Sequence, residues 1–214
     1  DGLVSTDFPG GGNDVANALA LQADGKLLAA GYAFNGLDYD FALARYLPDG
    51  SLDATFDGDG WQVIDFGGND EARALDIQED GNILLAGYSD GGVGFDFALA
   101  RLAPDGSLDM SFDQDGLLLT DFATGNDSAY ALALQPDGGI LLAGYTYLAS
   151  TSDFALARYL PDGSLDLSFD QDGWLSLDFA GYGDQAFALA LQSDGKVVAA
   201  GVAELGTQTA DFAL

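Results

Sequence analysis

The stretch DFALARYLPDGSLDATFDGDG, residues 40–60, decides the fold because the chain contains it three times with few changes. The second copy, DFALARLAPDGSLDMSFDQDG, covers residues 96–116, and the third, DFALARYLPDGSLDLSFDQDG, covers residues 153–173. A shortened copy, DFAL, occupies residues 211–214. A long segment that returns at nearly constant intervals indicates stacked or radially arranged repeat units.

A second repeated segment divides the whole chain into four units. Tetrapeptides of the form QxDG begin at Gln22, Gln78, Gln135 and Gln192, again at nearly constant intervals. We therefore predict a single domain over residues 1–214. Its repeats are approximately 1–58, 59–114, 115–171 and 172–214.

The apolar residues of each unit predict strands. They run in short bursts bounded by Gly, Asp, Asn and Pro, which is the pattern of strands and turns rather than of helices. In the second unit we predict four strands, at residues 61–66, 72–78, 82–89 and 96–102. The middle two are apolar on both faces, so neighbouring sheets should cover them on both sides.

Three quoted segments resemble a known repeat. LALQxDGKLLAAGY at residues 19–32, DFALARYLPDGSLDxxF, and a following strand that ends in DF are similar to the delta-60 repeat, a bacterial β-propeller repeat. The resemblance covers essentially the whole chain and implies an exported bacterial protein, extracellular or at the cell surface. It implies no activity. The expected fold class is all-β, a β-propeller of four repeats with one four-stranded antiparallel blade each.

Two arrangements of the four units are open. The chain begins on the last two residues of a connector and stops inside a DFAL strand, as a four-bladed ring opened at one connector would do. The alternative is four blades of a longer propeller or of an open array. The near-complete count of four units favours the ring.

Composition excludes several classes of function. The chain has 35 acidic and 6 basic residues and a net charge of −29, which disfavours binding to nucleic acid or to an anionic membrane. It contains neither Cys nor His, which removes disulfides, thiolate and imidazole chemistry and the usual zinc sites. No apolar run is long enough to span a bilayer, so we expect no membrane insertion.

Each of the three connectors is rich in Asp. Where the repeat would have a neutral FGxGG, this chain has FDGDG at residues 56–60 and FDQDG at 112–116 and 169–173. Turn chemistry explains Asp residues in such loops, whereas Asp residues two apart before a Gly bend also form part of many calcium loops. Adaptation to high salt is a third explanation. The candidate Ca²⁺ ligands are Asp53, Asp57, Asp59, Asp109, Asp113, Asp115, Asp166, Asp170 and Asp172.

Three Arg residues end the DFALAR strands. In so acidic a protein each is expected to form an ion pair, either with the Asp that begins the same strand or with a cross-strand carboxylate. The residues concerned are Arg45, Arg101 and Arg158, with Asp40, Asp96 and Asp153.

The leading hypothesis for function is a non-enzymatic, exported scaffold or interaction module, a cation-stabilised unit of an extracellular surface or fibre assembly. Its partners would be other protein chains, copies of itself included. One alternative is a carbohydrate- or peptide-binding propeller. It would use the loops that differ between units, residues 33–39, 89–95, 146–152 and 203–210. Another is a hydrolase or lyase with a metal site in a central channel, although catalysis normally needs one distinct site rather than a pair of carboxylates in every connector.

Overall fold

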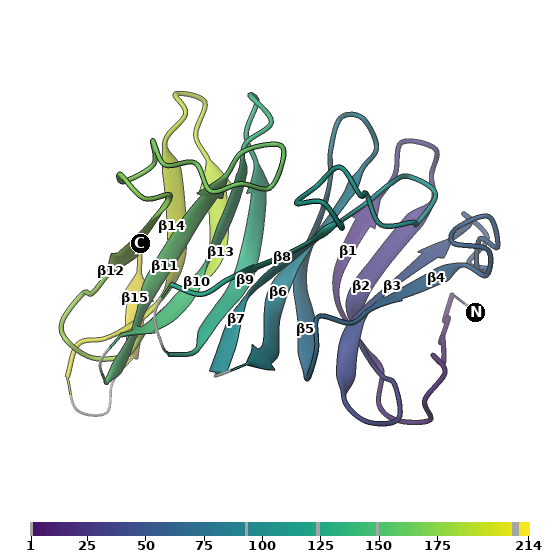
Figure 1. The fold of residues 1–214 in the computed structure, drawn as a ribbon, viewed down its shortest axis with the longest axis horizontal. Coiled ribbons are helices and arrows are strands. Elements are labelled where there is room, and N and C mark those ends of the chain that lie inside the picture. The colour runs from purple at the N-terminus through teal and green to yellow at the C-terminus, as the bar shows by residue number, and fades with distance from the viewer. Residues whose placement is uncertain (1, 93, 123–124, 149, 207–209) are drawn as a thin grey trace.

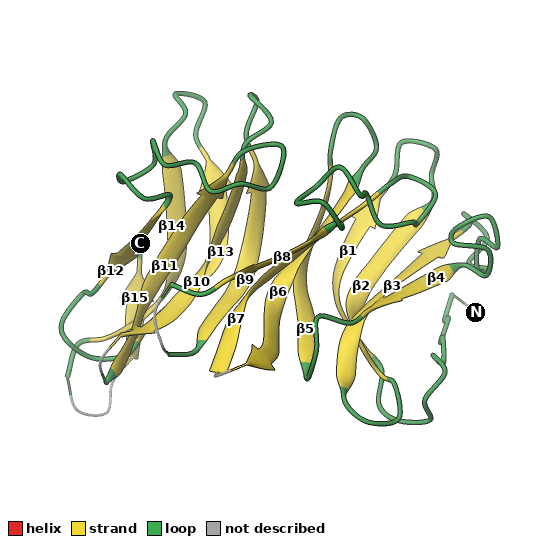
Figure 2. Cartoon of the chain, in the orientation of Figure 1, coloured by secondary structure: helices red, strands yellow, loops and turns green. Residues whose placement is uncertain are grey.

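The computed structural model describes residues 2–92, 94–122, 125–148, 150–206 and 210–214. These residues form strands and loops without a helix (Figure 2), so none of them forms a helix able to cross a bilayer. The strands are β1 Val15–Leu21, β2 Leu27–Phe34, β3 Tyr39–Tyr46, β4 Trp61–Ile64, β5 Asp70–Ile77, β6 Ile83–Gly92, β7 Gly94–Leu102, β8 Leu117–Thr120, β9 Asp127–Leu134, β10 Ile140–Leu148, β11 Thr151–Tyr159, β12 Trp174–Leu177, β13 Asp184–Leu191, β14 Val197–Glu204 and β15 Ala210–Ala213.

The strands form four antiparallel sheets, which stand in a row (Figure 1). Sheet A contains β1 to β4, sheet B contains β5 to β8, sheet C contains β9 to β12, and sheet D contains the three strands β13 to β15. The first strand of each sheet, which we call its inner strand, lies next to the first strand of the neighbouring sheet, in the order β1, β5, β9 and β13. The predicted all-β fold with antiparallel blades is confirmed.

The row of sheets is not closed. Sheet A and the N-terminus lie at one end, and sheet D and the C-terminus lie at the other (Figure 1). Sheets A and D lie apart at the two ends of the row, so the four sheets do not close into a ring (Figure 1). Both ends consequently expose apolar side chains, with Leu21 of β1 72% exposed and Phe212 of β15 85% exposed. Of the two arrangements that the sequence left open, the structure does not have the favoured ring and agrees with the alternative, four blades of a longer propeller or of an open array.

Sheets A, B and C each take their outer strand from the beginning of the next predicted repeat. Strand β4 pairs with β3, with Trp61 opposite Ala44, and not with β5. The connector imposes this pairing because it folds back on β3, where the Asp53 N–H donates to the Arg45 carbonyl and the Arg45 N–H donates to the Gly60 carbonyl, both at 2.9 Å. The sheets therefore cover residues 15–64, 70–120, 127–177 and 184–213, out of phase with the predicted repeats.

Residues 2–8 correspond to β4 in the repeat but form no strand. A segment at this position pairs with the DFALA strand that precedes it, as β4 does with β3. Residues 2–8 lie instead against sheet A, where Thr6 Oγ1 is 2.6 Å from the Tyr46 hydroxyl and the ring of Phe8 packs edge-on against Trp61.

The hydrophobic core has three parts, one between each two neighbouring sheets. Each part contains the Phe of a DFALA strand packed against the Phe of the next DF segment, with ring centroids 4.8–5.0 Å apart. These pairs are Phe41–Phe66, Phe97–Phe122 and Phe154–Phe179. Two connector residues, Phe56 and Phe112, are also fully buried between sheets. The aromatic residues of the repeat therefore hold neighbouring blades together.

A β-bulge interrupts each inner strand at the same place, opposite a Gly of the next strand. A Cβ on that Gly would lie only 1.8–1.9 Å from a backbone oxygen of the bulged strand, so no larger residue fits. The bulge residues differ between sheets and form contacts from one sheet to the next. Asn17 donates to the Ala72 carbonyl, the Arg73 guanidinium lies 5.9 Å from the Tyr130 ring, and that ring lies 5.4 Å from Phe187.

Candidate functional site

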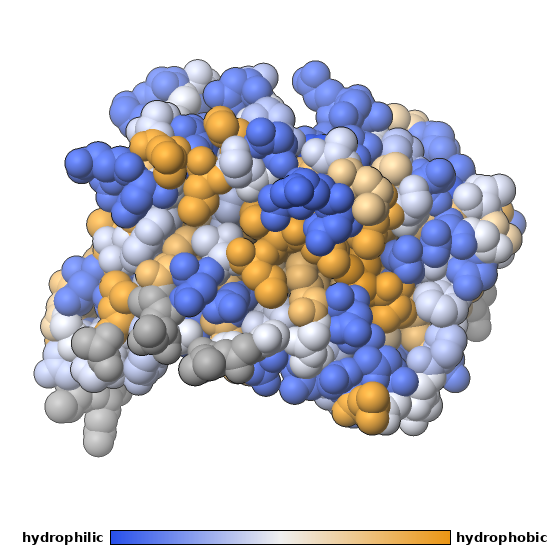
Figure 3. Space-filling view, in the orientation of Figure 1, coloured by the Kyte–Doolittle hydropathy of each residue, from blue (hydrophilic) through white to orange (hydrophobic). Residues whose placement is uncertain are grey.

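The loops divide between two edges of the sheets. One edge carries the QxDG turns and the connectors, and we call it the connector edge. There Lys26, next to the first turn, lies 3.1 Å from a carboxylate oxygen of Asp53 in the first connector. The opposite edge, the loop edge, carries the variable loops and the DF segments. Figure 3 shows hydrophilic residues along the upper, connector edge and apolar residues on the face below it.

An Arg of each DFALAR strand organises the connector edge. Arg45 Nε lies 2.9 Å from Asp53 Oδ2, its Nη1 donates to the Pro104 carbonyl of the next connector at 2.6 Å, and its guanidinium covers the Phe56 ring. Arg101 makes the same contacts one repeat later, with Asp109 and the Pro161 carbonyl. The predicted ion pairs exist, but the partners are Asp53, Asp109 and Asp166 rather than the Asp that begins each strand, because the connector brings its own carboxylate back to the Arg.

The nine predicted calcium ligands lie at the connector edge and show the contacts of turns. Asp53, Asp109 and Asp166 each accept from an Arg side chain and from the hydroxyl two residues later. Asp59, Asp115 and Asp172 each accept the backbone N–H two residues later. Asp57, Asp113 and Asp170 occupy left-handed turn positions, with φ of 44–47°. None of the nine belongs to the close acidic groups found among the described residues, and calcium binding here stays a prediction.

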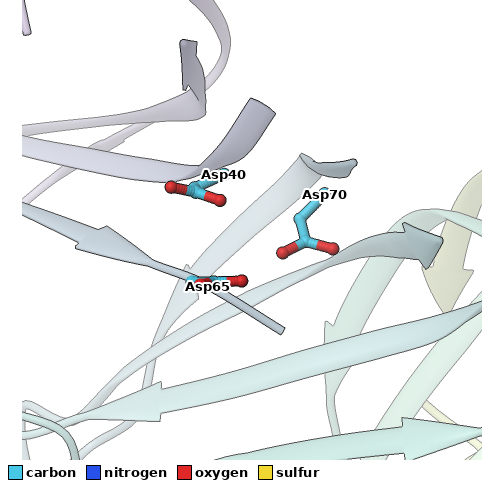
Figure 4. Close-up of side chains that lie close together, drawn as sticks. All are labelled: Asp40, Asp65 and Asp70. Atoms are coloured by element: carbon cyan, nitrogen blue, oxygen red, sulfur yellow. The ribbon is translucent and has the colours of Figure 1, made fainter. Parts of the chain in front are cut away.

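Three groups of three Asp residues, which we call the Asp triads, lie at the loop edge. In the first, Asp40 of β3, Asp65 directly after β4 and Asp70 at the start of β5 point toward one another (Figure 4). One oxygen from each lies within 4.8 Å of the others. The other two triads are Asp96, Asp121 and Asp127, and Asp153, Asp178 and Asp184.

Each triad joins two sheets and combines buried with accessible carboxylates. Asp70 is fully buried, its Oδ2 accepts the Phe66 N–H at 2.7 Å, and the Ser89 hydroxyl lies beside it as a second hydrogen-bond donor. Asp40 is 3% exposed, and its Oδ2 accepts from the Asn35 amide whereas its Oδ1 has no partner. Asp65 is exposed to solvent. Unpartnered buried oxygens of this kind are costly and are normally satisfied.

Burial raises the pKa of the inner triad carboxyl groups. Burial, with a smaller contribution from neighbouring carboxylates such as Asp65, raises the pKa of Asp40 and Asp70 to about 6 against hydrogen bonds that lower it. Burial also raises the pKa of Asp127 to about 6. The charged forms are thus disfavoured at the positions where the fold concentrates carboxylates.

The triads were not among the sites predicted from the sequence, although the sequence contains a signal for them. All three Asp positions recur in each of three repeats: the first residue of DFALA, the Asp of DF, and the Asp that follows DF shortly afterwards. The first two are far apart in the sequence, and the third belongs to the next sheet. Their proximity depends on the pairing of β4 with β3, which the predicted grouping of strands did not include.

Three segments, residues 22–56, 78–112 and 135–169, match a family model described as a beta-propeller domain of unknown function, DUF5122. Each matched segment runs from a QxDG turn through the DFALA strand to the connector Phe. Together with the four antiparallel sheets, the matches define the chain as a repeat protein of the β-propeller class. They support the repeat β-propeller part of the resemblance drawn from the sequence. No curated protein is detectably similar to the chain.

Proposed function

We propose that this chain is a non-enzymatic β-propeller module that acts as a scaffold or interaction unit outside a bacterial cell, with cations as stabilising partners. The observation that carries the proposal is repetition. The Arg–Asp pair of the connectors occurs three times, and so does the Asp triad. Within the part of the chain that the structure describes, no group of acidic side chains differs from the rest as a single catalytic centre would.

The two end sheets of the row expose apolar faces that a further blade or another protein chain would cover. At one end Leu19 and Leu21 are 66% and 72% exposed, and at the other Phe212 is 85% exposed. Apolar side chains gathered on an exposed sheet indicate an interaction surface. The net charge of −29 opposes contact between copies in dilute buffer, so divalent cations or salt should promote it.

Sedimentation velocity with and without calcium, at about 0.15 M salt, tests the assembly part of the proposal. We expect larger species with calcium, and we expect Leu21→Ser to reduce them. Leu37→Ser is the matched control, because Leu37 is 90% exposed but lies in a loop and not on an end sheet. A strictly monomeric chain under both conditions at high protein concentration contradicts a fibre or surface-layer unit.

A second candidate function, carbohydrate or peptide binding, is favoured by aromatic residues near the variable loops. Tyr39 packs against Tyr32 and Phe34 with centroids 5.2 and 5.4 Å apart, and Tyr88 packs against Phe95. Aromatic rings beside polar groups suit the faces of sugars. Residues 93, 149 and 207–209 of the predicted binding loops lie outside the described residues.

A glycan array tests this second candidate. A saturable hit that Tyr39→Ala removes and Leu167→Ser preserves supports binding at the variable loops, because Leu167 is 66% exposed but lies in a connector at the opposite edge. An array without a hit counts against carbohydrate as the ligand. A hydrolase or lyase remains the third candidate. Turnover of a model glycoside that a single Asp→Asn substitution abolishes would favour it over a scaffold.

A further inference from the structure

The Asp triads lie where two sheets meet, and among the described residues no basic side chain forms an ion pair with them. We propose that each triad is a binding site for a hard divalent cation, calcium in the first instance, which links one sheet to the next. In the first site Asp40 and Asp65 belong to sheet A and its DF segment, whereas Asp70 begins the first strand of sheet B. An ion held by all three would therefore connect neighbouring blades.

The basic residues of the chain are already engaged elsewhere. The chain contains only six of them, and each forms an ion pair with a carboxylate outside the triads. Five lie at the connector edge and pair with Asp residues of connectors or QxDG turns, and Arg73 pairs with Glu71. Three carboxylates within 4.8 Å of one another repel strongly when partly buried. No basic side chain relieves this repulsion, and a bound cation would supply positive charge at the triads.

Buried oxygen atoms without partners point to the same sites. Asp40, Asp153 and Asp184 are more than nine-tenths buried, and the Oδ1 of each has no hydrogen-bond partner. Buried oxygens without partners are satisfied in folded proteins by water or by an ion. Ser89 lies opposite Asp70 across the β5–β6 pair, and its buried hydroxyl, as a hydrogen-bond donor, partly offsets the rise that burial causes in the pKa of that carboxyl group. Thr146 stands in the same relation to Asp127 in the second site, so a hydroxyl oxygen lies beside each of these two triads.

The donor atoms select the class of ion. All candidate ligands are carboxylate or hydroxyl oxygens, which suit calcium and magnesium rather than zinc or copper. Calcium takes six to eight oxygens in a flexible geometry, whereas magnesium requires a near-ideal octahedron. Three Asp side chains, a hydroxyl and solvent on the exposed side of Asp65 suit the less demanding ion, so calcium should bind more tightly than magnesium.

The three sites differ in a way that predicts an order of affinity. The hydroxyl of Ser89 in the first site and of Thr146 in the second is replaced in the third by Ala203, which lies opposite Asp184. The third site therefore has one oxygen donor fewer. It should bind calcium most weakly.

Calorimetric titration of the chelator-treated full chain with calcium and then magnesium, at about 0.15 M NaCl, tests the proposal. We expect saturable binding of up to three calcium ions per chain, weaker binding of magnesium, and a higher melting temperature with calcium. Absence of saturable heat up to about 10 mM calcium overturns the proposal, because even weak extracellular sites bind in the millimolar range.

Charge-matched variants separate specific sites from attraction to a protein of −29 net charge. The test variant carries Asp65→Asn, Asp121→Asn and Asp178→Asn, all exposed positions at which the substitution leaves the core intact. The control carries Asp57→Asn, Asp113→Asn and Asp170→Asn in the connectors, which are also exposed. We expect the test variant to lose at least tenfold in calcium affinity and the control to bind as before.

Two results overturn the proposal: an equal loss in both variants, or a loss in the connector control alone. The second result would support the calcium ligands predicted from the sequence. Failure of this proposal is distinguishable from failure of the scaffold function. A monomeric chain that binds calcium through the triads confirms the metal sites and contradicts the assembly unit.

Discussion

Arg101 and Arg158 occupy equivalent positions in successive repeats but differ in one contact, which makes them a matched pair of mutations. Both approach the carboxylate of their own connector, Asp109 and Asp166, at 2.8 and 2.7 Å. Arg101 also donates to the Pro161 carbonyl of the next connector at 2.5 Å. Among the described residues Arg158 has no such contact, and its side chain is 25% exposed, compared with 9% for Arg101. We predict that Arg101→Ala destabilises the protein much more than Arg158→Ala.

The size of the difference follows from these contacts. A hydrogen bond from a charged donor contributes about 1.5–3 kcal/mol, and loss of Arg101 also leaves the mostly buried Asp109 without its counter-ion. We therefore expect Arg101→Ala to lower the free energy of unfolding by about 3 kcal/mol. Arg158→Ala removes a more solvated pair and should lower it by about 1 kcal/mol.

Urea unfolding, followed by circular dichroism at a fixed calcium concentration, measures the difference. With a slope of about 2 kcal/mol per molar urea, the two midpoints should lie about 1 M apart. Each variant removes one positive charge, so the change in net charge cancels in the comparison. Equal midpoints would refute the conclusion that the Arg–carbonyl contact between connectors stabilises the row of sheets, and Arg45→Ala should repeat the result for Arg101.

Three further predictions concern the turn, the bulge and the triad. Gln114 has a left-handed φ of 77° at the position where the first connector has Gly58. Gln114→Gly should therefore raise the free energy of unfolding in urea by about 0.5–1 kcal/mol, and Gly58→Gln should lower it. Gly87→Ala should lower the melting temperature sharply, since the new Cβ would lie 1.9 Å from the Glu71 carbonyl oxygen, and an unchanged melting temperature would contradict the bulge geometry. Burial raises the pKa of Asp70 from 3.8 to about 6. With divalent cations removed by a chelator, the folded state should therefore be most stable with respect to this group below pH 3.8, and that contribution to the free energy of unfolding should be lost as the pH rises through 6. Thermal unfolding of Asp70→Asn should then depend less on pH.

Much of the fold could be predicted from the sequence because its determinants are local. Apolar bursts between Gly and Asp turns define strands wherever they occur, and the regular recurrence of DFALA and QxDG requires each unit to have the same structure. The QxDG turns and the turn that opens each PDGSLD connector form through contacts between neighbouring residues. Asp49 illustrates this, since its Oδ1 accepts both the N–H and the hydroxyl of Ser51 two residues later.

The pairing of strands and the open row were decided by tertiary structure. Residues 61–64 are equally suited by sequence to join the sheet before or after them, and only the return of the connector onto Arg45 assigns them to sheet A. The angle between neighbouring sheets depends on how Phe and Ala side chains fill the space between them. A period in the sequence does not specify that angle, so it cannot distinguish a ring from an open array.

The candidate metal sites also depend on tertiary structure. The sequence by itself determined that the chain is rich in Asp and poor in basic residues, and that each unit repeats both features. It indicated the connectors because their Asp residues are close in sequence, where turn contacts and Arg side chains engage them. The Asp triads form from residues of two sheets, and their buried, unpartnered oxygens exist only once those sheets have packed. Proximity in sequence identifies turns, whereas a site between two blades requires the blades to be placed first.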